Sequence, residues 1–90
     1  MHEASLMNGL MRQLEKIGRA EGATRITGIH VWMGALSHMS HEHFCEHFEI
    51  AAKDTLAEGA RVHTTLSDDI GDKNAQTIIL EDVEIETPDP

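Results

Sequence analysis

The spacing of the apolar residues changes near residue 22. Of all the features of the sequence, this change most restricts the set of folds that the chain can adopt. Over residues 4–19, leucine and isoleucine recur at steps of four, four and three positions, which is the spacing of one face of an amphipathic helix. Gly22 favours an end to that helix. Over residues 24–33 the apolar residues alternate, as they do in a strand. A helix and a strand therefore have to pack within one small domain.

Strict alternation divides the strand at residues 24–33 between two faces. The expected core face holds Ile29, Val31 and Met33, and the opposite face holds Ile26, His30 and Trp32. The opposite face is expected to meet solvent or a partner.

A second helix is predicted from His41 to about Leu56. Ser40 is a suitable N-cap, and Glu42 places a carboxylate in the first turn, where the helix dipole favours it. Glu58-Gly59 is expected to stop the helix. Its predicted buried stripe holds Phe44, Phe48, Ala51, Ala52 and Leu56.

Two further strands are predicted after the second helix. Val62, Thr64 and Leu66 alternate with polar residues, and a strand over residues 77–86 turns Val83 and Ile85 away from its acidic side. Residues 68–74 are rich in turn-favouring types, which predicts a long hairpin connection. The fold class is therefore α+β, a two-layer sandwich of order α-β-α-β-β with a three-stranded sheet and both helices on one face. Residues 1–86 form the single domain, and residues 87–90 form a frayed tail.

Composition excludes several classes of function. With 16 acidic residues against 7 lysines and arginines, the net charge of −9 opposes binding to nucleic acid. No apolar run approaches the roughly 18 residues of a membrane-spanning helix, so we expect a cytoplasmic protein that binds no membrane. The single cysteine, Cys45, excludes an internal disulfide and a zinc site built from Cys-x-x-Cys pairs.

The N-terminus carries a candidate metal site. In Met1-His2-Glu3 the free α-amine lies one residue from an imidazole. The amine, the deprotonated amide of His2 and the His2 ring close a five- and a six-membered chelate ring, and the Glu3 amide or carboxylate supplies a fourth donor. Planar nitrogen donors suit Ni(II) or Cu(II) better than Zn(II). A histidine at position 2 is expected to keep Met1 in place; the alternative is an exposed, idle His2.

A second candidate lies in the predicted second helix. His41/Cys45 and His43/His47 are both i,i+4 pairs, a spacing that lets two side chains share a metal ion. A step of about 100° per residue puts the two pairs about 160° apart, so they do not combine within one chain. A two-fold dimer in which each chain contributes one pair is one alternative. Solvated histidines beside a partly buried Cys45 are the other.

No enzyme signature is present. Cys45 has histidine neighbours, but helical geometry does not aim a ring nitrogen at its sulfur as in a nucleophilic pair. The chain contains neither a Gly-x-x-x-x-Gly-Lys-Ser/Thr loop nor a Gly-x-Gly-x-x-Gly fingerprint. Asp82, Glu84 and Glu86 fit the polar side of a strand better than a catalytic pair of carboxylates.

The chain resembles the HypA/HybF family of nickel metallochaperones for [NiFe]-hydrogenase maturation over about residues 1–86. The resemblance rests on the opening Met-His-Glu followed by Ser5-Leu6, and on the strand that ends in a Gly-x-Leu-Ser segment at residues 34–37. It implies that the Met1 amine, the His2 ring and the amides at positions 2 and 3 bind nickel, with Glu3 associated. It also implies two partners, a maturation GTPase and the hydrogenase large subunit.

One departure from that family concerns zinc. Family members carry a zinc module with two Cys-x-x-Cys pairs between the last two strands, where this chain has only residues 67–76. We therefore expect Ni(II) as the metal, no structural zinc and no enzymatic activity. The leading function is capture of Ni(II) at the N-terminus and its delivery to a partner. The alternative is a zinc-free assembly module that forms homodimers through metal bridging at the second helix or through the sheet face of Trp32.

Overall fold

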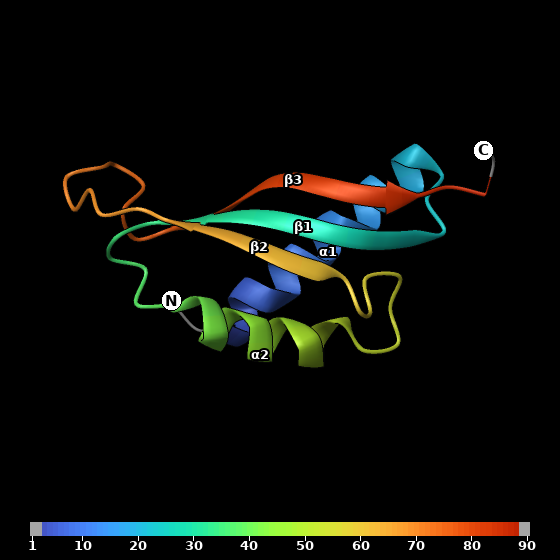
Figure 1. Ribbon diagram of the computed structural model, residues 1–90, viewed down its shortest axis with the longest axis horizontal. Coiled ribbons are helices and arrows are strands. Elements are labelled where there is room, and N and C mark those ends of the chain that lie inside the picture. Colours follow the sequence, from blue (N-terminus) through green and yellow to red (C-terminus); the bar gives the residue numbers. More distant parts are fainter. Residues whose placement is uncertain (1–2, 89–90) are drawn as a thin grey trace.

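The computed structural model describes residues 3–88 and has the predicted order of helices and strands (Figure 1). The elements are α1 (Glu3–Glu21), β1 (Arg25–Met33), α2 (His41–Ala52), β2 (Arg61–Leu66) and β3 (Ile78–Glu86). Neither helix in this part of the chain combines the length and the apolar composition that crossing a membrane requires.

The three strands form one mixed sheet in the order β2-β1-β3. The central strand β1 runs parallel to β2 and antiparallel to β3. The predicted hairpin between the last two strands is wrong, because β2 and β3 lie at opposite edges of the sheet. The segment between them instead crosses the end of β1, as Figure 1 shows. Hydrogen bonds hold this crossing, from Gly34 N to the Thr77 carbonyl (2.9 Å) and from Leu36 N to the Ala75 carbonyl (2.7 Å).

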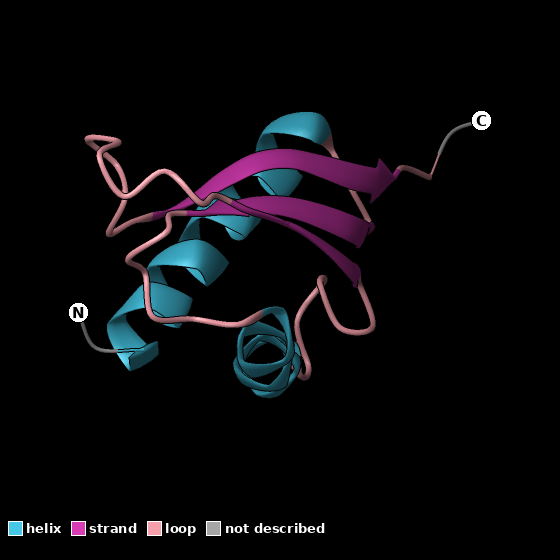
Figure 2. Ribbon diagram, turned by 60° about the vertical axis from the view of Figure 1, so that its left-hand side comes forward, coloured by secondary structure: helices cyan, strands magenta, loops and turns pink. Residues whose placement is uncertain are grey.

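Both helices pack against the same face of the sheet, which confirms the two-layer α+β prediction (Figure 2). The rings of Phe44 and Phe48 stack in α2 with their centroids 6.1 Å apart, and both are buried. The largest fully buried side chains come from α1, α2 and the central strand β1: Phe44, Leu14, Ile26, Ile29, Met33 and Val31. With few aromatic residues available, aliphatic and methionine side chains supply most of this core.

Ile26 lies on the core face, so its predicted position beside His30 and Trp32 is wrong. The register of β1 against β3 shifts between Ile26 and Gly28, which adds one residue to β1 at this point. The added residue reverses the alternation, and Ile26 becomes completely buried. The face assigned to Val31 and Met33 is confirmed, since both side chains are also completely buried.

Helix α2 is shorter than predicted. Its start is confirmed, since the Ser40 hydroxyl accepts a hydrogen bond from His43 N at 3.1 Å as an N-cap. The helix ends at Ala52, because Lys53 is extended and Asp54 takes a positive φ of 65°. Leu56 therefore lies in a turn, where it still packs against the core.

Candidate metal site

The predicted nickel ligands fall at the very start of the chain. Met1 and His2 lie outside the described residues, and Glu3 is the first residue of α1. The chain therefore enters its first helix directly after the two residues expected to hold the metal. The unpaired amides of a helix N-terminus begin at the same point.

A cavity of about 390 Å³ lies beside the first turns of α1. Its lining combines α1 with the loop that follows β1 and with the start of β3: Leu6, Leu36, Ser37, His38, Met39, Gln76 and Ile78. Met39 is buried, whereas His38 is exposed and has a φ of 59°, in the left-handed region that non-glycine residues rarely adopt. Nothing in the sequence pattern brings His38 to this end of α1.

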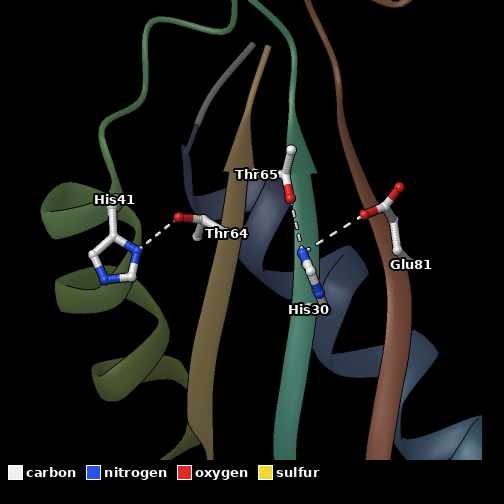
Figure 3. Close-up of polar contacts among 5 residues, drawn as sticks. All are labelled: His30, His41, Thr64, Thr65 and Glu81. Atoms are coloured by element: carbon white, nitrogen blue, oxygen red, sulfur yellow. Dashed lines mark hydrogen bonds and ion pairs between the residues drawn. The ribbon is translucent and has the colours of Figure 1, made fainter.

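The structure brings His41 and Cys45 of α2 together. His41 Nδ1 lies 2.8 Å from the Thr64 hydroxyl of β2, as Figure 3 shows, and this contact fixes the ring. Cys45 Sγ lies 3.5 Å from Nε2 and 4.0 Å from Nδ1 of that ring. Because the two distances are similar, the sulfur lies beside the ring, and neither nitrogen lone pair points straight at it.

The thiol is not set up as a nucleophile. Burial raises the pKa of Cys45, and the negative charge of Glu49 raises it further. A raised pKa leaves the thiol protonated at neutral pH, whereas nucleophilic cysteines need a lowered one.

The other predicted pair, His43 and His47, also lies close together, with ring centroids 4.7 Å apart and ring planes tilted by 42°. Within residues 3–88, no group of three or more histidine, cysteine, aspartate or glutamate side chains is placed to hold a metal ion. Each pair on α2 therefore offers at most two protein ligands from one chain.

The outer face of the sheet carries a polar cluster that the sequence did not reveal (Figure 3). His30 Nε2 in β1 lies 2.9 Å from the Thr65 hydroxyl in β2 and 3.8 Å from a Glu81 carboxylate oxygen in β3. The ring of His63 lies 6.3 Å from that of His30. The missed signal was the helix between the first two strands, since a strand-helix-strand unit favours a parallel pair and so places positions 30 and 63 side by side.

The fold is shared with solved metallochaperone structures. The solution structure of the Ni metallochaperone HypA from Helicobacter pylori superimposes with a TM-score of 0.80, covering 97% of this chain and 99% of that one. At 17% sequence identity, this similarity supports the fold alone.

Sequence relatives point to the same group. Hydrogenase maturation factor HypA of Acidithiobacillus ferrooxidans is 34% identical over 62 residues, which is 69% of this chain and 55% of that protein. Hydrogenase maturation factor HybF of Salmonella typhimurium is 33% identical over 63 residues, 70% of this chain and 56% of that protein. The aligned segment thus spans about half the length of these curated relatives.

A family model described as hydrogenase/urease nickel incorporation, metallochaperone, HypA matches residues 1–70. The matched segment includes α1, β1, α2 and β2, and it begins at the Met-His-Glu sequence. The description is that of a metallochaperone and not of an enzyme. The chain therefore belongs to the HypA family of hydrogenase/urease nickel-incorporation metallochaperones.

Proposed function

We propose that this protein captures Ni(II) at its N-terminus and delivers it during hydrogenase maturation. The observation that carries the proposal is the family match, which starts at residue 1 and so includes Met1, His2 and Glu3. In this proposal the Met1 amine, the His2 amide and the His2 ring bind the metal, and the Glu3 amide or carboxylate supplies the fourth donor. Residues 1–86 act as one nickel-binding domain in the cytoplasm.

A terminal chelate suits a carrier better than a storage site. A few ligands on one chain end dissociate one after another, whereas a closed cage has to open as a unit. The amine and amide must lose protons to bind, so nickel binding weakens as the pH falls. The proposed receivers are a maturation GTPase and the hydrogenase large subunit, in line with the relatives named as hydrogenase maturation factors. No resident zinc takes part in this mechanism.

The free α-amine gives the most selective test. We expect equilibrium dialysis to find one nickel ion per chain in the untagged protein. Acetylation of the α-amine removes this donor without altering any side chain or shifting His2, and it should abolish tight binding. Binding that is unchanged by acetylation would contradict the proposal.

The close contact between His41 Nε2 and Cys45 Sγ, at 3.5 Å, favours a second candidate function. In this alternative the domain is an assembly module in which two chains each contribute a pair of ligands to a bridging metal. Light scattering with and without a chelator separates the two functions. Chelator-sensitive dimers that persist after His2→Ala, and disappear after Cys45→Ser, would favour assembly.

A further inference from the structure

The outer face of the sheet, opposite both helices, carries two histidines side by side. His30 of β1 and His63 of β2 are register partners in the parallel pair, and neighbouring strands lie about 4.7–4.9 Å apart. Their ring centroids are 6.3 Å apart, with the ring planes tilted by 47°. Solvent reaches both side chains, since His63 is exposed and 42% of the His30 side chain is exposed. Two imidazoles are therefore open to one ligand from solution.

A metal ion can join the two rings after a small rotation of one of them. Imidazole nitrogens bound to one metal at about 2.0–2.1 Å in neighbouring positions lie about 3 Å apart. In the part of the chain that the structure describes, no hydrogen bond or ion pair fixes the His63 ring, so it is able to turn toward His30. Imidazole suits nickel, copper and zinc as a ligand.

His30 has the supporting contacts that a metal-binding histidine needs. Figure 3 shows its Nε2 between Thr65 and Glu81, 2.9 Å from the hydroxyl and 3.8 Å from a carboxylate oxygen. A histidine that binds a metal through one ring nitrogen almost always donates the N–H of the other to such a group. The Glu81 carboxylate favours the proton on Nε2, which leaves the lone pair of Nδ1 for the metal.

The charges beside this pair favour a cation. Gly28 has no side chain, and the Glu84 carboxylate occupies the space where its Cβ would lie. Glu81 adds a second carboxylate on the same face, while Arg61, the register partner of Gly28, offsets one of the two charges. Among the described residues, no third histidine, cysteine or carboxylate is placed to bind a metal with the pair. Water therefore completes the coordination.

We propose that His30 and His63 form a second metal site, which binds one nickel(II) ion with water in its remaining positions and with Glu81 and Thr65 orienting His30. The site does not depend on the proposed function, because it shares no residue with the N-terminus. Two ring nitrogens hold nickel less tightly than a four-donor chelate. The site therefore fills at nickel concentrations above those that saturate the N-terminus. With mostly water ligands the ion is octahedral, so it adds no planar-type absorbance.

The magnetism of nickel(II) separates the two sites in a nuclear magnetic resonance titration. A planar nickel ion is diamagnetic, whereas an octahedral one is paramagnetic and broadens the signals of nearby amides. We expect broadening around positions 30 and 63, both in the wild type and in His2→Ala. His63→Thr should abolish it, and threonine suits an exposed strand. His47→Ala is the matched control, because it removes one histidine of the pair on α2 and should leave the broadening unchanged.

Glu81→Gln tests the orienting contact with a readout that a structural role would not move. It removes the charge beside His30 and should weaken nickel binding at this site by about 10–100-fold, while circular dichroism shows an unchanged fold. Unchanged affinity in this variant would overturn the role of Glu81. Broadening around position 30 that is absent from the wild type, or that persists in His63→Thr, would overturn the site itself. A wild type without planar-type absorbance would instead overturn the proposed function, so the two failures are distinguishable.

Discussion

Gly34→Ala should destabilise the fold strongly, because no side chain fits where the β2–β3 connection crosses the end of β1. A Cβ atom at position 34 would overlap the backbone of Ala75 and would lie 2.5 Å from the Asn74 carbonyl oxygen. These are backbone atoms, so rotation of a side chain does not relieve the overlap. The crossing would have to move as a whole.

The size of the effect follows from the contacts at this crossing. Overpacking costs about 1–3 kcal/mol. Moving the crossing also weakens the hydrogen bonds from Gly34 N to Thr77 and from Leu36 N to Ala75, at about 0.5–1.5 kcal/mol each. We therefore expect a loss of about 2–6 kcal/mol in the free energy of unfolding. This is a large share of the stability of a small domain.

Gly9→Ala is the matched control, and it should change the free energy of unfolding in the opposite direction. Gly9 lies within α1, and a Cβ at that position would meet no atom within 4 Å apart from its chain neighbours and the backbone of its own helix. Alanine there should stabilise the protein by about 0.5–1 kcal/mol, because glycine loses more backbone entropy in a helix. Urea unfolding followed by circular dichroism measures both variants. Equal stability of Gly34→Ala and the wild type would refute the account of the crossing.

Three smaller predictions concern α2. Phe44→Ala should lower the free energy of unfolding by about 3–5 kcal/mol in urea unfolding, because the ring is completely buried; a loss below about 1 kcal/mol would contradict this. Ser40→Ala should cost about 1 kcal/mol through loss of the N-cap, and an unchanged melting temperature would contradict it. Alkylation of Cys45 should follow thiolate formation at a higher pH than for an exposed cysteine, and Glu49→Gln should lower that pH by removing a negative charge. Equal alkylation rates in the two proteins across the pH range would argue against the role of Glu49.

The sequence was sufficient to predict the order of helices and strands and the packing of both helices on one face of the sheet. Apolar spacing locates α1 and the core face of β1 at Val31 and Met33, because those side chains repeat with the period of the element that carries them. Ser40 correctly marks the start of α2, since N-capping is a local property of a few residues. The alternation of apolar and acidic residues likewise predicts the exposed acidic side of β3.

The errors concern features set by contacts between distant residues. The order β2-β1-β3 depends on which strand pairs with the centre, and turn-rich residues between β2 and β3 are equally compatible with a crossing. The reversed position of Ile26 depends on an added residue opposite β3, which no local pattern displays. The approach of His38 to the cavity beside Leu6 likewise requires the path of the whole β1–α2 loop. The proposed ligands Met1 and His2 lie outside the described residues and stay a prediction.

A nickel titration followed by absorbance spectroscopy tests the central claim most directly. The protein should be untagged and should carry Cys45→Ser, so that the thiol near His41 does not compete for the metal. The account predicts a yellow, planar-type nickel spectrum that saturates at one ion per chain and disappears when His2→Ala is added. An unchanged spectrum and stoichiometry after His2→Ala would contradict binding at the N-terminus.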